Sequence, residues 1–416
     1  MASNHTQSAG TKAAFGPRKL QQAKLRLWVY RALKIAGARP TKAFPDYFEF
    51  APAVRDTQEF SDLSTRVSCY LQDTGVPLYL PGARFSLSPD AVPHFDPSLI
   101  RDPGWVNDRP EGVGHLIVHR ITPATLRMMA TSAVPFTVVD TRLHAYSELQ
   151  YFALRNKATW PTYRPAEEAL QRLRALGGPG SSAFILATGP SALEVDPAAI
   201  TADVRITCNS AVRDLERIRK FRPNVITFMD PVFHFGPSRY AAAFRRDAVR
   251  AAEEVDALVV CGDTFAGPLL GLVPSLRERL AVIPHQEGGP WRWPTDHNPT
   301  MRQAGNVLTG LMLPLALMLA DDVAIAGADG REPNENYYWK HNPALQYEED
   351  LMQTVFDAHP SFFRDRNYED YYDEHCANLE TLIRLGEAHG KTVRGATSSW
   401  VPALRTRGAP APEITS

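Results

Sequence analysis

Short apolar runs alternate with helical patterns over the second half of the chain. None of these runs alternates between apolar and polar positions, which is typical of strands buried on both faces of a sheet. The runs lie at residues 183–187, 204–207, 225–229, 257–261, 280–283, 323–326 and 392–394. Apolar residues at helical spacing between them predict helices over residues 211–221, 239–255, 305–320 and 371–389. This alternation predicts an α/β fold with a Rossmann-like, doubly wound and mostly parallel sheet.

The pattern is weaker in the first half of the chain. Residues 114–118 and 134–139 are predicted strands, and residues 123–130 are a predicted helix. We therefore expect an additional N-terminal α+β domain of uncertain fold. The predicted organisation is a basic arm at 1–45, an N-terminal domain at 46–176, a linker at 177–182, a Rossmann-like domain at 183–405 with a lid at 330–372, and a flexible tail at 406–416.

The basic arm has an unusual charge distribution. Residues 1–45 carry nine Lys or Arg and no Asp or Glu. Residues 18–37 are a predicted amphipathic helix whose apolar stripe is formed by Leu20, Leu25, Trp28, Leu33 and Ile35. Such a helix either lies on an anionic membrane surface or packs on its own domain.

Composition excludes several classes of protein. The net charge of −1 gives no global attraction to nucleic acid. The four cysteines, at 69, 208, 261 and 376, form no CxxC pair, which argues against a zinc site or a disulfide framework. No apolar run reaches the roughly 18 residues that span a bilayer. We expect a cytoplasmic protein with peripheral membrane contact as an option.

The first apolar run of the second half ends in the turn Thr188-Gly189-Pro190-Ser191. Parallel sheets bind ligands outside the carboxyl ends of their strands, so this turn is a candidate site. Glycine lets the backbone approach a ligand closely, and a helix start offers N–H groups to a phosphate. Alternatively, Ser191 and Glu194 form a capping box, which needs no ligand.

The second run ends at Cys208 and Asn209. Dinucleotide sites carry an acidic residue near this place to hold ribose hydroxyls. The chain has neither that acid nor a GxGxxG motif, which argues against a dehydrogenase or a methyltransferase. The Asn209 amide either caps the next helix or suits a ligand that is already anionic.

Three further segments follow predicted strands or open a buried helix. Asp230 precedes Pro231 and is either a turn former or a reactive carboxylate. The pair Thr309-Gly310 allows either close approach to a ligand or tight helix packing. Asp329 precedes the long aromatic-rich segment 330–372, which is predicted as a lid or as a surface excursion packed by its own aromatics.

In this order the segments resemble the bacterial CMP-sialic-acid-dependent sialyltransferases and the wider set that includes the motility accessory factor glycosyltransferases. The resemblance covers about residues 183–400. It implies a variant glycosyltransferase A-type fold, and an enzyme that uses no metal and no cofactor. The implied donor is an acidic sugar, of the sialic acid or 3-deoxy-octulosonic acid kind, activated by CMP. The implied acceptor is a hydroxyl of a glycan or glycolipid, as in cell-surface polysaccharide biosynthesis.

The same resemblance implies roles for individual residues. The donor-binding residues would be Gly189, Pro190, Ser191, Asn209, Thr309, Gly310 and Asp329. Tyr337 and Tyr338 would assist departure of the phosphate. His375 would take the proton of the acceptor hydroxyl, with His341, His359 and Asp230 as competitors for that role. An Arg usual before the Thr-Gly pair is absent, and either Arg302 or Arg331 is its substitute.

Two other functions use the same fold. A pterin pyrophosphokinase-like phosphotransferase would need Mg²⁺ and paired carboxylates, for which Asp230, Asp263 and Asp329 are candidates. A non-catalytic nucleotide-sugar-binding protein would bind CMP without turnover. The N-terminal domain and the loop that contains Trp291 and Trp293 are candidates for acceptor binding.

Overall fold

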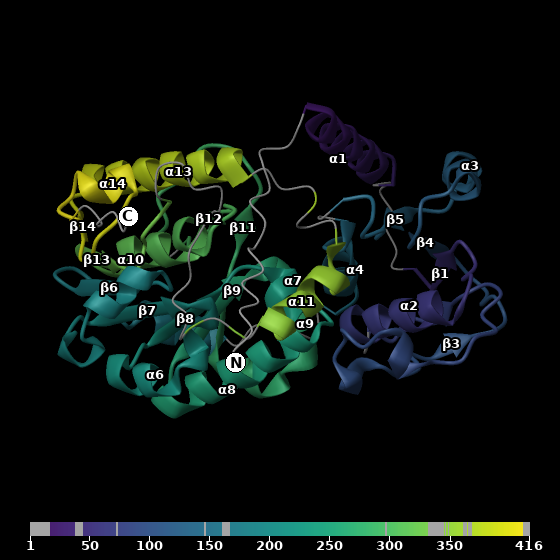
Figure 1. Cartoon of the computed structure of the whole chain (residues 1–416), viewed down its shortest axis with the longest axis horizontal. Helices are drawn as coiled ribbons and strands as arrows, with labels where there is room; N and C mark the ends of the chain where they lie inside the picture. The colour runs from purple at the N-terminus through teal and green to yellow at the C-terminus, as the bar shows by residue number, and fades with distance from the viewer. Residues whose placement is uncertain are drawn as a thin grey trace, which may run out of the picture.

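The chain forms two parallel β-sheets with helices packed around both (Figure 1). A separate pair of short strands, β11 (His285–Gln286) and β12 (Met301–Arg302), is also parallel. The structure is a computed structural model, and it describes residues 17–37, 45–71, 74–144, 147–159, 167–295, 298–331, 345, 347, 349–360, 364 and 368–410.

The larger sheet has the strand order β10-β9-β8-β7-β6-β13-β14. Its strands are β6 (Ser182–Leu186), β7 (Val204–Cys208), β8 (Val225–Phe228), β9 (Leu258–Gly262), β10 (Leu280–Ile283), β13 (Asp322–Ala326) and β14 (Thr392–Gly395). Each predicted run forms one of these strands, and all neighbours are parallel. The prediction of a doubly wound parallel sheet is confirmed.

Helices cover both faces of this sheet. In Figure 1, α10 (Leu313–Leu319), α13 (Tyr368–Ala388) and α14 (Pro402–Arg405) lie on one side of the strands, and α6 (Leu215–Phe221) and α8 (Arg239–Val255) lie on the other. The strands are buried on both sides accordingly: Val225 of β8 packs in one core, whereas Ile226 and Phe228 pack in another. Other α-helices described in this half include α5 (Glu167–Arg174), α7 (Pro231–Phe235), α9 (Asp263–Leu272) and α11 (Glu349–Ala358).

The N-terminal half has its own five-stranded sheet with the order β3-β2-β1-β4-β5. Its elements are β1 (Tyr47–Ala51), α2 (Thr57–Tyr70), β2 (Leu78–Tyr79), β3 (Trp105–Val106), β4 (Gly114–Val118), α3 (Pro123–Thr131), β5 (Phe136–Val138) and α4 (Gln150–Thr159). All its strand pairs are parallel. The region expected to be an N-terminal α+β domain of uncertain fold therefore contains a second parallel β-sheet with its own helices, which is an α/β arrangement.

One hydrophobic core joins the two sheets. It contains Phe48 and Phe152 of the N-terminal half together with Phe228, Phe244 and Val259 of the larger sheet and its helix α8. The glycine-rich turn between the halves is also held in place, because Gly180 N–H donates to the carboxylate of Asp321 at 2.6 Å. The two halves are packed together as well as linked.

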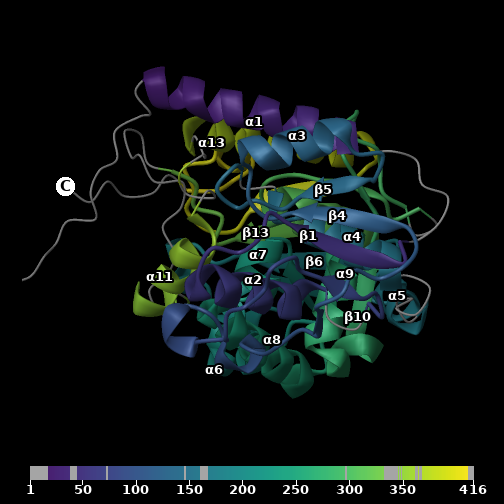
Figure 2. The ribbon, with the colours of Figure 1, turned by 90° about the vertical axis from the view of Figure 1, so that its right-hand side faces the viewer.

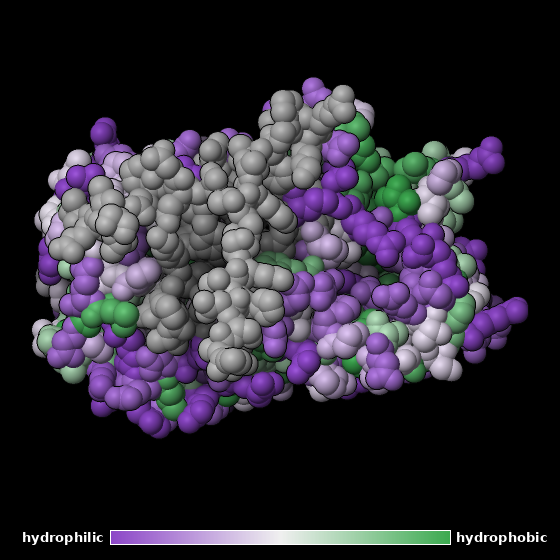
Figure 3. Space-filling model, viewed as in Figure 1, coloured by the Kyte–Doolittle hydropathy of each residue, from purple (hydrophilic) through white to green (hydrophobic). Residues whose placement is uncertain are grey.

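Helix α1 (Pro17–Gly37) lies along the same upper side of the molecule as α3 (Figure 2). Hydrophobic residues gather on the surface near these two helices, whereas most of the other surface coloured by hydropathy in this view is hydrophilic (Figure 3). Within the described part of the chain, no helix has the length and apolarity that crossing a bilayer requires.

Candidate functional site

The predicted site residues follow consecutive strands of the larger sheet. The order β8-β7-β6-β13 brings Asp230, Asn209, Gly189 and Asp329 to one edge, because each comes just after the carboxyl end of its strand. Gly310 reaches the same edge, since a Cβ atom built on it would lie 2.3 Å from Sδ of Met229, the neighbour of Asp230. The sheet therefore assembles the segments that the sequence singled out.

The turn after β6 is fastened by Asp329. The Ser191 N–H and hydroxyl donate to the two carboxylate oxygens of Asp329 at 2.8 and 3.0 Å. The same hydroxyl lies 2.9 Å from Oγ1 of Thr397, which accepts the Gly327 N–H at 3.0 Å. Burial raises the pKa of Asp329, and the hydrogen bonds from Ser191 oppose that rise. These four residues hold the ends of β6, β13 and β14 together.

One expectation about this turn is wrong. Ser191 and Glu194 form no capping box, because Gly189 precedes the short helix Pro190–Glu194 and Glu194 accepts hydrogen bonds from Ser398 instead. Three N–H groups of this turn and of the helix start also have partners within the protein. The N–H of Gly189 donates to Gly327 O, that of Ser191 to Asp329, and that of Ala192 to Gly189 O. The sequence pattern could not show that these donors are used internally.

Gly189 is required by its close contacts. A Cβ atom there would lie 1.9 Å from Oδ2 of Asp329 and 2.6 Å from the carbonyl oxygen of Gly327. Gly189→Ala is therefore expected to lower the free energy of unfolding by about 1–3 kcal/mol, as overpacking does. Denaturant unfolding measures this. Gly178→Ala is the matched control, because nothing lies within 4 Å of a Cβ built there; equal losses in the two variants would contradict the account.

Asn209 has an unusual backbone and an unsatisfied side chain. Its φ of 47° is in the left-handed region, which non-glycine residues seldom adopt. It caps no helix, because Cys208 holds that position before the short helix Asn209–Arg213. Within the described residues, its buried Oδ1 has no hydrogen-bond partner. A buried polar atom of this kind calls for an explanation, and a ligand donor at the strand edge supplies one.

Asp230 caps a helix. Its Oδ1 accepts the N–H groups of Val232 at 3.2 Å and Phe233 at 3.1 Å, at the start of α7. The turn-forming role suggested by the sequence is therefore present in the structure. A role in catalysis would have to coexist with this cap.

The Thr309-Gly310 pair lies in a π-helical turn (Leu308–Met312) that continues into α10. Thr309 is fully buried, and its hydroxyl donates to Asn306 O at 3.2 Å. Gly310 allows the turn to pack against Met229. The tight-packing alternative is thus realised, and π-helical turns of this kind are frequent at functional sites.

The N-terminal part of α13 faces the same edge. The Tyr372 hydroxyl accepts the Arg331 N–H at 3.1 Å, and a Cβ atom on Gly305 would meet the ring of Tyr371 at 2.2 Å. His375, one helical turn further on, is buried, and burial lowers its pKa to about 4. His375 is therefore a neutral imidazole at pH 7.

Of the other predicted residues, three are outside the described chain, His359 is separated from this edge, and the two arginines stack on aromatic rings. Tyr337, Tyr338 and His341 lie outside the described residues. His359 is buried against Glu148, with Nδ1 2.7 Å from Oε2, so its contact is with the N-terminal half. Of the proposed arginines, Arg331 stacks on Tyr372 and Arg302 stacks on Trp291, each with the guanidinium 4.9 Å from the ring centre.

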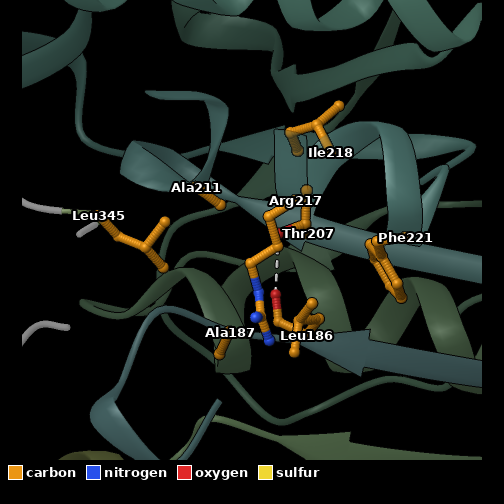
Figure 4. Close-up of a pocket in the computed structure, with 8 residues that line it drawn as sticks. All are labelled: Leu186, Ala187, Thr207, Ala211, Arg217, Ile218, Phe221 and Leu345. Carbon is orange, nitrogen blue, oxygen red and sulfur yellow. Dashed lines mark hydrogen bonds between the residues drawn. The ribbon is translucent and has the colours of Figure 1, made fainter. Parts of the chain in front are cut away.

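The sequence analysis missed two residues that shape this edge. Thr397, just after β14, bridges Ser191 and Gly327 as described above. Arg217 of α6 lines a small pocket with Leu186, Ala187 and Leu345, and its guanidinium donates to Ala192 O. Figure 4 shows this side chain pointing toward Ala187 at the end of β6. Position after a strand was a usable signal for Thr397, but no local pattern marks Arg217.

The carboxylates proposed for a phosphotransferase do not form one cluster. Asp329 follows β13, which is three strands away from β8 and Asp230. Asp263 accepts the N–H groups of Thr264 at 2.9 Å and His285 at 3.2 Å. Across the described ranges, no group of three or more His, Cys, Asp or Glu is arranged to hold a metal ion.

The two Trp residues suggested for acceptor binding are partly buried, and each is already in contact with another side chain. Trp293 stacks on His389, with ring centres 4.1 Å apart, and Trp291 is covered by Arg302. Both indoles also pack against the core of the larger sheet. These contacts favour plain packing over a sugar platform.

No family model and no curated protein matches this sequence. The sialyltransferase CstII from Campylobacter jejuni in complex with a substrate analogue, CMP-3FNeuAc, matches with a TM-score of 0.32 and 10% identity over 57% of this chain and 88% of that chain. A variant of the sialyltransferase CST-II in complex with CMP matches with a TM-score of 0.31 and 11% identity, again over 57% of this chain and 88% of that chain. At these values no shared activity follows from the similarity.

Proposed function

We propose that the chain is a glycosyltransferase that moves an acidic sugar from a CMP-activated donor to a hydroxyl of a glycan or glycolipid acceptor. The transfer would invert the anomeric configuration and use no metal. The observation that carries the proposal is Asn209 at the end of β7, with its left-handed backbone and a buried Oδ1 that has no hydrogen-bond partner among the described residues. The five segments that resemble sialyltransferases support the choice of CMP over other nucleotides.

A neutral amide at this position suits an anionic donor. A carboxylate there would repel the phosphate and the sugar carboxylate of a CMP-activated acidic sugar. The Asn209 Oδ1 can instead accept an N–H from the ligand at no electrostatic cost. Because the N–H groups of Gly189, Ser191 and Ala192 are used internally, donor binding in this proposal rests mainly on Asn209 and on the backbone around Thr309 and Gly310.

In the proposed reaction, a new bond forms between the acceptor oxygen and the anomeric carbon while the bond to the phosphate oxygen breaks. The hydroxyl proton goes to a base, CMP carries away the bonding electron pair, and Tyr337 and Tyr338 donate to the departing phosphate. His375 is the proposed base. It lies on the face of α13 that carries Tyr371 and Tyr372, and Tyr372 contacts the segment after β13.

The pH profile tests the role of His375. Because burial lowers its pKa to about 4, the free enzyme keeps this imidazole deprotonated above that value. We expect kcat/KM to be level between neutral pH and the lowered pKa, and to fall as the pH drops through it. His375→Ala is expected to lower kcat by about 10²–10⁴-fold.

A different pH profile of kcat/KM would indicate that another residue is the base. An acid limb with its midpoint near the ordinary histidine pKa, and kept by His375→Ala, would contradict the assignment. Asp230→Asn is the comparison variant, since it preserves an oxygen that can cap α7 while removing the carboxylate.

The nucleotide that the protein binds distinguishes the proposed function from its alternatives. A ligand that binds only the folded state raises the melting temperature, so we expect CMP to stabilise the protein in EDTA more than UDP, GDP or S-adenosylmethionine does. Stabilisation by ATP that requires Mg²⁺ would indicate the phosphotransferase instead. Stabilisation by CMP without release of CMP from any CMP-sugar would indicate a non-catalytic binding protein.

A further inference from the structure

Helix α1 has apolar residues on two opposite faces. The sequence predicted one stripe, but the structure divides it, because Tyr30 and Leu33 face the protein whereas Leu25, Trp28 and Ile35 are exposed. At about 100° per residue, the three exposed positions fall within about 80° of one another on the helix. The two faces therefore need separate explanations.

The inner face is docked on the N-terminal half. Tyr30 is buried, its hydroxyl accepts a hydrogen bond from Nε2 of Gln150 at 2.9 Å, and its ring stacks on His144 with centres 5.3 Å apart. At the end of the helix, Gly37 contacts Phe136 of β5. These contacts fix which side of α1 points outward.

The outer face is apolar and flanked by cations. Leu25 is 60% exposed, Trp28 is 67% exposed and Ile35 is 77% exposed. Lys24 and Arg31 are exposed beside them, and the first 45 residues contain no Asp or Glu. Helix α3 lies on the same side of the molecule as α1 and carries the exposed Leu126, and hydrophobic surface gathers near both helices in Figure 3.

We propose that this outer face of α1, defined by Leu25, Trp28 and Ile35, binds an anionic lipid bilayer. The three side chains would enter the boundary between headgroups and acyl chains, and Lys24 and Arg31 would contact lipid phosphates. Charge selects this occupant, since a second copy of the chain would bring the same cations to the contact and be repelled. The inference is independent of the proposed sugar transfer.

Vesicle co-sedimentation of the full chain tests the proposal. We expect binding to vesicles of phosphatidylcholine mixed with phosphatidylglycerol, weak binding to phosphatidylcholine alone, and weaker binding as salt is raised. The triple variant Leu25→Ser, Trp28→Ser, Ile35→Ser is expected to bind the anionic vesicles at least about tenfold less tightly. The double variant Lys24→Glu, Arg31→Glu is expected to lose the preference for anionic lipid.

Leu193→Ser is the matched control, because Leu193 is also a leucine exposed by 60% but lies far along the chain, in the short helix Pro190–Glu194 after β6. It should bind vesicles as the unchanged protein does. Unaltered melting temperatures in all variants show that the fold is intact. Equal binding to both lipids, no binding to either, or full binding by the triple variant would overturn the proposal. Self-association that the triple variant abolishes would also overturn it, in favour of a dimer contact.

Discussion

Replacing Glu148 with Gln is expected to lower the free energy of unfolding by about 3–5 kcal/mol, the usual loss when a buried ion pair loses one partner. Glu148 is fully buried, and its Oε1 lies 2.5 Å from Nη1 of Arg66 and accepts the Tyr70 hydroxyl at 2.8 Å. Its Oε2 lies 2.7 Å from Nδ1 of His359. The substitution puts a neutral amide beside the buried Arg66 cation and leaves it paired with Asp62, whose Oδ1 lies 2.8 Å from Nε.

The free energy of unfolding at acidic pH tests Glu148 in a second way. Burial by itself would raise the pKa of Glu148, but the Arg66 cation and His359 outweigh it and lower the pKa to about 2 from 4.5. A carboxylate with a lowered pKa contributes stability above its ordinary pKa and loses it as the pH falls through the lowered value. We therefore expect the unchanged protein to lose stability over that interval, and Glu148→Gln to lose less.

Glu216→Gln is the control for these measurements. Glu216 pairs with Lys220 on the surface, where its side chain is 76% exposed, and exposed pairs contribute about 0–1 kcal/mol. Urea unfolding at several pH values compares the three proteins. If Glu148→Gln is at least as stable as Glu216→Gln at neutral pH, the buried contacts of Glu148 do not stabilise the packing of α2 against the segment after α11.

Replacing Asn209 with Gly is expected to weaken CMP binding by about tenfold or more, since a hydrogen bond to a buried group contributes about 1–3 kcal/mol. The fold should be retained, because glycine adopts the φ of 47° without strain. Asn209→Asp keeps the shape but adds a negative charge beside an anionic ligand, and it should bind CMP still more weakly. Isothermal titration with CMP measures both variants.

Asn209→Ala distinguishes the effect of losing the side-chain amide from the effect of straining the backbone. It lacks the amide, as Asn209→Gly does, but it also carries about 1–2 kcal/mol of strain from the left-handed conformation. We expect the two variants to bind CMP equally and Asn209→Ala alone to be less stable. Unchanged CMP affinity in Asn209→Gly would mean that the unpartnered Oδ1 does not face the ligand.

The sequence predicted the larger sheet well because its strands are buried on both faces. Apolar runs such as residues 280–283 need no knowledge of their neighbours to be recognised as strands. The N-terminal sheet was predicted only in part: the runs at 114–118 and 134–139 match β4 and β5, whereas β1, β2 and β3 were not recognised. Its first strand, β1, places Glu49 within a short apolar run, and the buried face of α2 includes small polar residues such as Ser61, Ser64 and Ser68.

The sequence predicted which residues lie at the carboxyl ends of the strands, but it did not predict the contacts that these residues make. Position after a strand was enough to bring Gly189, Asn209 and Asp329 to one edge. The hydrogen bond between Asp329 and Ser191 joins residues 138 positions apart. No local sequence pattern could therefore predict that this carboxylate stabilises the turn after β6. The same limit applies to His375, whose burial depends on how α13 packs.

The most direct test of the proposed transfer is CMP release from CMP-sialic acid and other CMP-sugars in the presence of EDTA and a hydroxyl acceptor. The account predicts release that depends on the acceptor and that falls strongly in Asn209→Gly, His375→Ala and Tyr338→Phe. Release that strictly requires Mg²⁺, or turnover of ATP in preference to every CMP-sugar, would contradict it.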